Sequence, residues 1–527
     1  MTRTTSPRGQ DSRAAGWRRS VPAVLLGLLV IALVIPAGFA LGPGFAGPSR
    51  PPAVPAAGPW QLPPSALTAV PGAVKPLDDA APVPNAATLA DRLNATLKTD
   101  GGGTFTGMVQ DAVTGEVLFD RAGDEGRAPA SNIKLLTAAA AFRTLGPDRR
   151  FTTRVIAGAT PGTVVLTGGG DVLLGAGDSA PDAVLGHAGL ATLAKSTVTA
   201  LRQAGVTGAV TVQLDDSLFT GPSLSPAWSP EDVAAGEVAP LFPLALNGAR
   251  FAPGSTAGAR PQDAAMTAAE AFAARLGEAG GSAGITVAPG IVRAKAPTPE
   301  AGGKGQGSKD PAEKGDGGAS GGSSDSSSDA ADAGPRAGAV LAEAESATVS
   351  EQVDLLLRTS DNYLAEVMGR MVALATGQPG SGEGAIAAVL KQLQELKIPT
   401  DTLHAADLAG LTLDNRVTAR QLTALVRAMT NGPDTRLRSA LAGFPVAGLT
   451  GTLGSRYTDA TTAAGAGLVR AKTGTLNSVI ALSGYVVDAD GRLLVFSFIG
   501  NGLTPGAAGN KEALDRTAST LAACGCR

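Results

Sequence analysis

The sequence of 527 residues has few of the residue types on which many binding sites depend. Aromatic residues make up 4% of it, and it holds two histidines and two cysteines. A stacking platform for bases or sugars is therefore not expected, and a His/Cys metal cluster and a disulfide framework are excluded. The formal net charge of −3 excludes a basic nucleic-acid footprint. A Ser-His-Asp hydrolase would need His187 or His404, so hydrolytic chemistry is expected to use another base.

The N-terminus has the pattern of an export segment. Residues 1–20 carry five arginines against one acidic residue and predict a basic cytoplasmic tail. Residues 21–42 are apolar and uncharged, and this length can span a bilayer. The lengths of both regions favour a retained membrane anchor, and a signal peptide cleaved near Ala40 is the alternative. Under either interpretation the remainder of the chain works outside the cytoplasm, anchored to the membrane or secreted to the cell wall.

Two stretches have compositions that do not support a folded core. Residues 41–85 hold twelve of the 36 prolines, which predicts a Pro-rich linker over 43–85. From Arg293 to Gly338 there is no Ile, Leu, Val, Met or aromatic residue, and we expect a disordered Gly/Ser/Asp linker over 293–340. The rest of the chain is long enough for one large core with an inserted domain. Cys524 and Cys526, either bridged or unpaired at the end of the chain, are assigned no role.

The hydrophobic periodicity predicts a mixed α/β architecture. Hairpins are expected at 104–119 and 478–499, close to the two ends of the folded part, with helices between them. This order favours an antiparallel sheet assembled from distant segments. Residues 151–292 alternate short apolar runs with turn residues and predict one or two mainly β subdomains. The helices are expected at 131–145, 349–376 (broken near 360–362), 384–396, 418–429 and 510–523.

Ser131 and Lys134 form a Ser-x-x-Lys at the start of a strongly apolar helix. Taken alone, the pattern is better explained by Ser131 as a helix N-cap. The spacing nevertheless has a chemical consequence, because residues three apart lie on one helix face and the Lys134 amine can lie beside the Ser131 hydroxyl. A lysine buried among apolar neighbours, with a second cation nearby, loses its proton more easily and can act as a base.

Two further short motifs follow along the chain. Residues 360–362 read Ser-Asp-Asn between two predicted helices, and residues 472–474 read Lys-Thr-Gly before the last hairpin. Each has an ordinary explanation by itself, as a polar break between helices and as a strand entry with a turn glycine. In this order, Ser-x-x-Lys, Ser-Asp-Asn and Lys-Thr-Gly are the signature set of class A β-lactamases and penicillin-binding proteins.

Longer stretches around these motifs sharpen the resemblance. They are Pro129–Thr137, Leu166–Asp171, Leu214–Phe219, Trp228, Asp407–Leu411, Pro445–Gly448, Gly451–Leu453, Arg456 and Ala471–Thr475. Over most of residues 86–520 the chain resembles the D-alanyl-D-alanine carboxypeptidase/endopeptidase family, the low-molecular-mass class C penicillin-binding proteins. One departure is Ala409, where the family usually has Ser in a Ser-Gly-Leu-Ser stretch.

The resemblance implies an α/β fold of the penicillin-binding/β-lactamase-like transpeptidase type, in which an antiparallel sheet flanked by helices is interrupted by the mainly β insert. The 229 residues between Ser131 and Ser360 exceed what a class A β-lactamase uses. The catalytic domain is therefore expected in two parts, 86–150 and 341–527, separated by the insert (151–292) and the disordered linker (293–340).

The resemblance also implies catalytic roles. Ser131 would attack the carbonyl between the two terminal D-alanines of a peptidoglycan stem peptide, and Lys134 would take its proton. Ser360 would relay a proton to the leaving D-alanine, and Asn362 would hold the substrate amide and Lys134. β-Lactam antibiotics would acylate Ser131, and the implied mechanism calls for no metal or organic cofactor. A β-lactamase of the same superfamily and a catalytically inert wall-binding module are the alternatives.

The strand that begins at the third motif is implied to bind substrate through Lys472, Thr473, Gly474 and Thr475. The side chains of Lys472, Thr473 and Thr475 would hold the carboxylate of the leaving D-alanine. The oxyanion would lie between the backbone N–H groups of Ser131 and Thr475.

Overall fold

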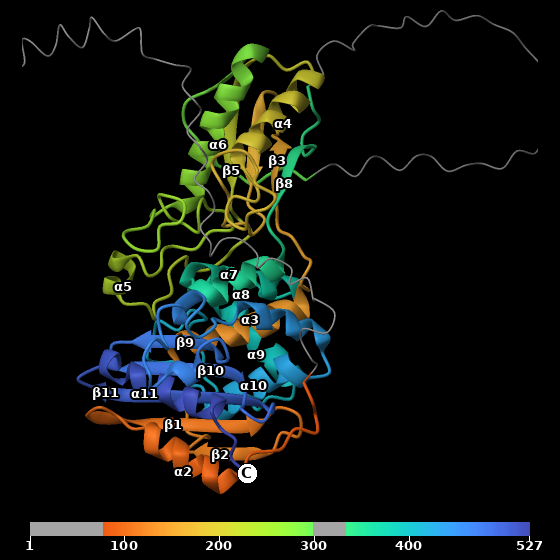
Figure 1. Cartoon of the computed structure of the whole chain (residues 1–527). Helices are drawn as coiled ribbons and strands as arrows, with labels where there is room; N and C mark the ends of the chain where they lie inside the picture. Colours follow the sequence, from red (N-terminus) through yellow and green to blue (C-terminus); the bar gives the residue numbers. More distant parts are fainter. Residues whose placement is uncertain (1–76, 299–333) are drawn as a thin grey trace, which may run out of the picture. The chain divides into compact units, whose positions relative to one another are not determined.

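A computed structural model of the chain describes residues 77–298 and 334–527 (Figure 1). The predicted tail at 1–20, the anchor or signal segment at 21–42, and most of both predicted linkers lie outside the described residues. Within the part of the chain that is described, no helix is long and apolar enough to cross a membrane.

The first sheet has five antiparallel strands in the order β2-β1-β11-β10-β9. Both predicted hairpins are confirmed, and β1 pairs with β11 from Gly102 opposite Thr504 to Asp111 opposite Leu494. The two ends of the folded chain therefore meet side by side within one sheet, as the sequence predicted. The strands are β1 (Gly102–Asp111), β2 (Val117–Arg121), β9 (Arg470–Leu476), β10 (Val479–Val487) and β11 (Leu493–Thr504).

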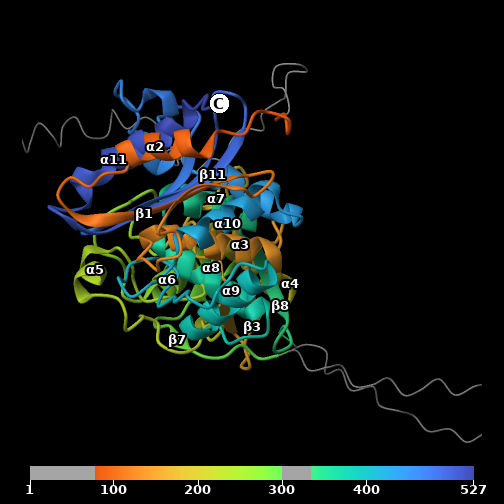
Figure 2. The same cartoon turned by 90° about the horizontal axis from the view of Figure 1, so that it is seen from below.

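Helices cover both faces of this sheet. On one face α2 (Ala86–Thr96) and α11 (Ala507–Ala522) pack against each other, and Figure 2 shows them beside β1 and β11. On the other face α10 contacts β1, β10 and β11, and α3 packs among the remaining helices. These helices are α3 (Lys134–Thr144), α7 (Val349–Thr359), α8 (Asn362–Ala375), α9 (Gly382–Glu395) and α10 (Ala419–Asn431).

Helix α3 is the centre of the larger core. Every residue from Lys134 to Phe142 is buried, as expected from a sequence that is apolar on all sides. Its run of four alanines at 138–141 keeps the side chains small, so neighbouring helices can approach it closely. The consequence for the site is that Lys134, the first residue of this helix, is fully buried.

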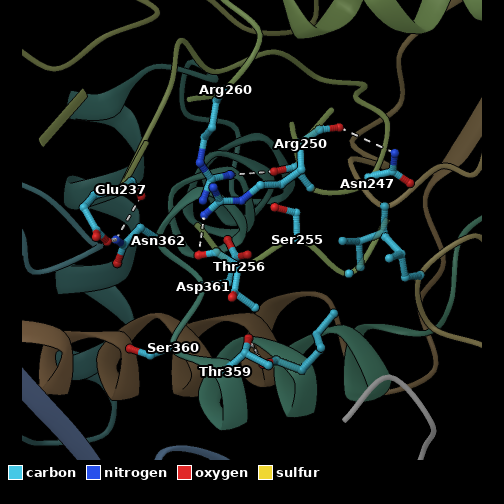
Figure 3. Close-up of a pocket in the computed structure, with 15 residues that line it drawn as sticks. Glu237, Asn247, Arg250, Ser255, Thr256, Arg260, Thr359, Ser360, Asp361 and Asn362 are labelled. Carbon is cyan, nitrogen blue, oxygen red and sulfur yellow. Dashed lines mark hydrogen bonds between the residues drawn. The ribbon is translucent and has the colours of Figure 1, made fainter. Parts of the chain in front are cut away.

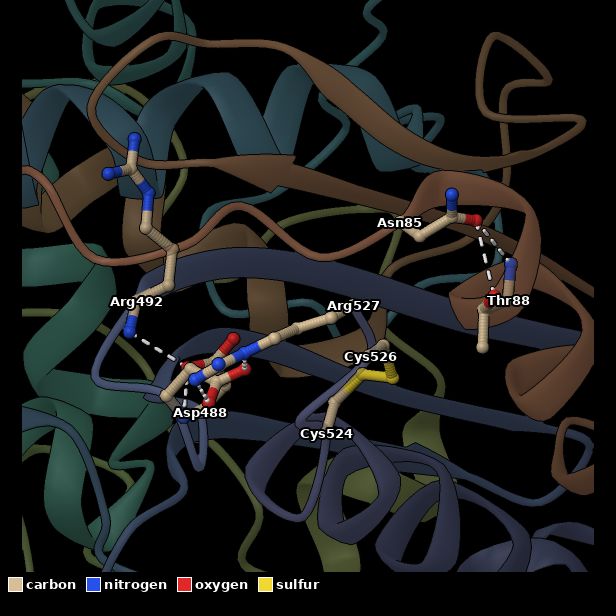
Figure 4. The surroundings of a disulfide bond; sticks show 8 residues. Asn85, Thr88, Asp488, Arg492, Cys524, Cys526 and Arg527 are labelled. Atoms are coloured by element: carbon tan, nitrogen blue, oxygen red, sulfur yellow. Dashed lines mark hydrogen bonds and ion pairs between the residues drawn. A yellow bond between two sulfur atoms is a disulfide. The ribbon is translucent and has the colours of Figure 1, made fainter.

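The C-terminus is tied to the start of α2. Cys524 and Cys526 form a disulfide bond, which settles the pairing that the sequence left open, and both side chains are buried (Figure 4). The carbonyl of Cys526 accepts a hydrogen bond from the backbone N–H of Asn85, whose side chain in turn caps α2 by accepting from the N–H of Thr88. The last residues thus hold the first helix of the described chain.

The insert contains a second sheet, in the order β6-β5-β4-β3-β8, with β7 paired to β5. It is not mainly β, because three helices accompany the strands. Strand β4 is parallel to β5, and β5 is parallel to β6. The elements are β3 (Thr152–Ala157), β4 (Thr163–Thr167), α4 (Leu190–Gln203), β5 (Gly208–Asp215), α5 (Pro230–Ala235), α6 (Ala264–Gly280), β6 (Ile285–Val287), β7 (Val292–Arg293) and β8 (Val340–Glu345).

The physical reason for this correction lies in the crossovers. Parallel neighbours need a long connection, and α4 and α6 supply it between β4 and β5 and between β5 and β6. In α6 the buried side chains Ala265, Ala268, Phe272 and Leu276 recur every three or four residues, which is the helical period. Strand β8 pairs with β3, so the chain returns from the insert after Glu345 rather than at 341.

Candidate active site

The backbone around Ser131 is held in an unusual shape. A 3₁₀ turn, η1 (Ala130–Ile133), leads into α3, and Ala130 has a left-handed φ of 46°, which costs an L-residue about 1–2 kcal/mol. A side chain on Gly474 would come within 2.7 Å of the Pro129 carbonyl oxygen, and one on Gly410 within 2.1 Å of the Ala130 carbonyl oxygen. Both glycines are therefore required for the close approach of β9 and the 407–412 loop to the backbone of Ser131.

The Ser131 hydroxyl is not a helix cap. The N-cap of α3 is Ile133, which makes no side-chain capping bond, so the N-cap interpretation of the first motif is wrong. Instead, Ser131 Oγ lies 2.8 Å from Lys134 Nζ and 3.5 Å from the carbonyl oxygen of Ala409. The hydroxyl thus faces a basic group and no backbone N–H of its own helix.

Lys134 is fully buried and donates to three acceptors. They are Ser131 Oγ at 2.8 Å, Asn362 Oδ1 at 2.7 Å and the carbonyl oxygen of Ala409. Burial lowers the pKa of the Lys134 amine to about 8, although nearby carboxylates, Asp407 foremost, favour its charged form. The amine is therefore partly neutral near physiological pH, as a base must be.

The Ser-Asp-Asn motif occupies the kink between α7 and α8. Ser360 ends α7 with a left-handed φ of 61°, and Asp361 caps α8 by accepting from the N–H of Leu364 at 2.8 Å. Asn362 is the first residue of α8. The amide of Asn362 donates from Nδ2 to the carbonyl oxygen of Glu237 at 3.0 Å (Figure 3). This contact orients Oδ1 toward Lys134, whose amine donates to it.

Lys472, on β9, connects the third motif to the second. Its Nζ donates to Ser360 Oγ at 2.9 Å and to the Thr473 carbonyl oxygen at 2.7 Å. Burial, followed by the charge of Lys134, holds the pKa of Lys472 well below its usual range. The two lysines and two serines form a polar cluster of two hydrogen-bonded pairs, Ser131 with Lys134 and Ser360 with Lys472.

A cleft of about 940 Å³ opens onto this cluster. Five of the eight residues predicted for the site line it, whereas Lys134 and Lys472 lie fully buried behind it and Gly474 packs against the backbone of η1. Residues of the insert also line the cleft, and three of them, Glu231, Asp232 and Glu237, are acidic. The predicted residues that line the cleft are Ser131, Ser360, Asn362, Thr473 and Thr475.

Several contacts of the site were missed from the sequence. The carbonyl oxygen of Ala409 binds Lys134, and that of Glu237 binds Asn362. Both are backbone atoms, and residue type does not predict where a backbone carbonyl will lie. Thr452 lines the cleft and its Oγ1 lies 2.7 Å from Thr473 Oγ1. The segments 407–411 and 451–453 were noticed only as part of the family resemblance, and Ala409 acts through its carbonyl, so the missing Ser hydroxyl does not remove this contact.

A second, smaller cavity of about 150 Å³ adjoins Ser360, Asp361 and Asn362 on the side of the insert (Figure 3). It holds the guanidinium groups of Arg250 and Arg260. Arg250 donates to the carbonyls of Thr256 and Gly258, and Arg260 donates to those of Gly236 and Gly248. These hydrogen bonds fix the backbone of the 236–260 segment, which lines the cavity together with the second motif.

Comparison with known proteins gives one consistent result. The profile of the D-Ala-D-Ala carboxypeptidase 3 (S13) family matches residues 89–276 and 320–522. Carboxypeptidase DacB of Mycolicibacterium smegmatis is 36% identical over 523 residues, which cover 98% of this chain and 99% of that protein. A carboxypeptidase of Mycobacterium tuberculosis is 34% identical over 468 residues, covering 88% of this chain and 90% of that protein.

A solved structure supports the fold. The crystal structure of penicillin binding protein 4 from Haemophilus influenzae superposes with a TM-score of 0.59 at 17% sequence identity, covering 83% of this chain and 98% of that one. The predicted penicillin-binding fold is thereby confirmed. The chain belongs to the D-Ala-D-Ala carboxypeptidase 3 (S13) family and is a serine-type D-Ala-D-Ala carboxypeptidase.

Proposed function

We propose that Ser131 is the nucleophile and Lys134 its general base in hydrolysis of the bond between the two terminal D-alanines of a peptidoglycan stem peptide. The observation that carries this assignment is the 2.8 Å contact between Lys134 Nζ and Ser131 Oγ at the floor of the cleft. A base must lie within hydrogen-bond reach of the proton it takes and have a pKa near the working pH, and Lys134 meets both conditions.

The first half of the reaction forms an ester. Neutral Lys134 takes the hydroxyl proton while Ser131 Oγ attacks the carbonyl carbon of the penultimate D-alanine. The tetrahedral oxyanion is stabilised by the backbone N–H groups of Ser131 and Thr475. When the C–N bond breaks, the proton passes through Lys134 and Ser360 to the leaving nitrogen, and D-alanine departs with its amine restored.

The second half removes the acyl group. A water molecule gives its proton to Lys134 and attacks the ester carbon, and Ser131 regains its proton as the shortened peptide leaves. Asn362 serves both halves, because its Oδ1 fixes the amine of Lys134 while its side chain lines the cleft beside the substrate amide.

The side chains of Thr473 and Thr475 and the charge of Lys472 would receive the carboxylate of the terminal D-alanine. Lys472 is buried, and a carboxylate arriving beside it favours its protonated form. The contact from Lys472 to Ser360 then couples occupation of the carboxylate site to the residue that passes the proton to the leaving group.

The same acyl-enzyme chemistry extends to two finer expectations. A β-lactam presents a carbonyl and a carboxylate in the same arrangement and would acylate Ser131, and a stem crosslinked through its D-alanine would be cut by the endopeptidase reaction. We also place the enzyme outside the cytoplasm, anchored or secreted. The predicted segment 21–42 and the disulfide of Cys524 with Cys526 support that location.

The test uses purified residues 77–527, a fluorescent penicillin, and a synthetic stem peptide ending in D-Ala-D-Ala. We expect one D-alanine released per peptide and a penicilloyl adduct that survives a denaturing gel and maps by mass spectrometry to the peptide containing Ser131. An adduct that forms and disappears within seconds would favour a β-lactamase. A folded sample with neither adduct nor D-alanine release would leave the inert wall-binding module.

The rate of acylation should depend on pH through Lys134. Its pKa of about 8 lies below the usual 10.5, so at pH 7 about one tenth of the amine is neutral, against about one part in three thousand for an unperturbed lysine. We therefore expect the second-order acylation rate constant to rise with pH and level off above about pH 8. Stopped-flow measurements from pH 5.5 to 9.5 check this, and a rate that falls over that range would contradict Lys134 as the base.

A further inference from the structure

The loop whose carbonyl binds the Lys134 amine is itself held by a buried carboxyl group. The carbonyl oxygen of Ala409 is one of the three acceptors of the Lys134 amine. The backbone N–H groups of Leu408 and Ala409 both donate to the same atom, Oε1 of Glu366, at 2.7 and 2.8 Å. The peptide groups on either side of the Ala409 Cα are therefore fixed between one carboxyl group and one amine.

Glu366 lies on α8, one turn beyond Asn362. Residues four apart share a helix face, so both side chains project from the same face of α8. Asn362 binds the Lys134 amine directly, and Glu366 holds the backbone whose carbonyl binds it. Glu366 is 4% exposed. A carboxyl group buried this deeply destabilises the protein unless hydrogen bonds offset its loss of hydration.

Asp407 fixes the rest of the same loop. Its Oδ1 accepts from the N–H of Gly410 and from Asn415 Nδ2, each at 2.8 Å, and its Oδ2 accepts from the N–H of Leu411 and from Trp228 Nε1, each at 3.0 Å. Trp228 belongs to the insert, so the loop beneath Lys134 is anchored from both α8 and the insert.

We infer that Glu366 is a positioning residue for Lys134, which it acts on through the 408–409 backbone by holding the Ala409 carbonyl against the amine. The inference rests on the proposed role of Lys134 as the base. The Ala409 carbonyl is the one contact of the amine that lies outside the three motifs, and it is supported by a carboxyl group that does not line the cleft.

Two substitutions separate hydrogen bonding from charge. Glu366→Ala removes the acceptor of both N–H groups, so the carbonyl of Ala409 is released from the base. We expect the acylation rate constant to fall about 10- to 100-fold, because a small misplacement of a reacting group has effects of that size. The dissociation constant of the non-covalent β-lactam complex should stay unchanged. Glu366→Gln keeps an oxygen at the Oε1 position and should restore most of the rate.

The charge of Glu366 is tested separately from its hydrogen bonds, through the pH dependence of the acylation rate. Burial raises the pKa of Glu366 to about 7, so its carboxyl group is charged mainly above pH 7. In that range Glu366→Gln removes a negative charge that favours the protonated form of Lys134, and the acid limb of the pH–rate profile should move to lower pH. Charged groups that act on either residue also include Asp361, Glu237 and Asp407 near Lys134, Lys472 beside it, and Asp407 and Arg370 near Glu366. They are unchanged in the variant.

Asp171→Asn is the matched control. Asp171 is a buried carboxyl group of the insert that accepts from a backbone N–H, that of Leu173 at 2.9 Å, and burial raises its pKa to about 7, as burial does for Glu366. It is not among the charges that act on Lys134. The control should share any loss of thermal stability and leave both the acylation rate constant and the acid limb as in wild type.

The outcomes are distinguishable. A folded Glu366→Ala that acylates at the wild-type rate, a Glu366→Gln as slow as the alanine variant, or an acid limb that Glu366→Gln leaves in place above pH 7 would overturn the inference. If Glu366→Ala does not fold, the glutamine variant and its pH profile still decide. Ser131→Ala is measured beside them, because label on that variant would remove the proposed function itself rather than the role of Glu366.

Discussion

Ser131→Ala is expected to abolish the penicillin adduct and to lower the hydrolysis of D-Ala-D-Ala peptides at least about 10,000-fold, the scale on which loss of a nucleophile acts in serine hydrolases. Ser131 lines the open cleft, and its hydroxyl oxygen, a nucleophile once its proton is removed, lies in contact with Lys134 Nζ. Water entering in its place would lack the fixed position from which an ester can form. The measurement is fluorescent labelling on a denaturing gel together with D-alanine release.

The same variant should stay folded. Lys134 keeps two acceptors after the hydroxyl is gone, Asn362 Oδ1 and the Ala409 carbonyl, so the change in unfolding free energy should be about 1 kcal/mol or less. Ser519→Ala is the matched control, because Ser519 is a buried serine whose hydroxyl donates to the Thr462 carbonyl outside the cleft. It should label as wild type does. A folded Ser131→Ala that still takes up label would contradict the assignment of the nucleophile.

The parts of the fold that could be predicted are those fixed by local periodicity. The break between α7 and α8 is one example, since Ser360, Asp361 and Asn362 are residues that end or cap helices, and the structure has Ser360 in a left-handed conformation and Asp361 as the cap. Helix α6 shows the limit. Its alanines give weak contrast between apolar and polar faces, and the short apolar runs separated by glycine in this part of the sequence predict strands.

The parts of the site that could be predicted are side chains whose chemistry follows from residue type and spacing. Ser131 and Lys134 face each other because they are three residues apart at the entry of one helix. What could not be predicted depends on backbone atoms brought from elsewhere in the chain. The carbonyls of Glu237 and Ala409 approach the site only when the insert and the 407–412 loop have folded over α8.

The insert also supports the residues that hold the base. The carbonyl of Glu237 orients the Asn362 amide, and Trp228 anchors Asp407 beneath the base, so two of the three acceptors of Lys134 depend on contacts with the insert. If the insert only separated the two parts of the catalytic domain, its Trp228 would not be expected to be buried against the loop beneath Lys134. The catalytic domain and the insert are therefore expected to be interdependent, and the site incomplete without residues 223–260.

Lys134→Ala is expected to lower the acylation rate constant about 100- to 10,000-fold, the usual range for loss of a general base. The residual rate should no longer rise with pH near 8, because the group that titrates there is gone. Non-covalent binding of the β-lactam should persist, since Thr473, Thr475 and Lys472 are retained. Lys472 cannot replace the lost base without moving, because its amine is already bound to Ser360 and to the Thr473 carbonyl.

The variant carries a structural cost that has to be separated from the catalytic one. Without the amine, Asn362 Oδ1 and the Ala409 carbonyl are left buried without a donor, which costs about 1–3 kcal/mol. Lys134→Met fills more of the space and also lacks the amine, so it should be the more stable of the two and equally slow. Lys391→Ala, an exposed lysine of α9, controls for loss of a lysine as such. If either Lys134 variant acylated at the wild-type rate with an unchanged pH profile, the base would have to be sought in Lys472, the other buried amine within the cluster.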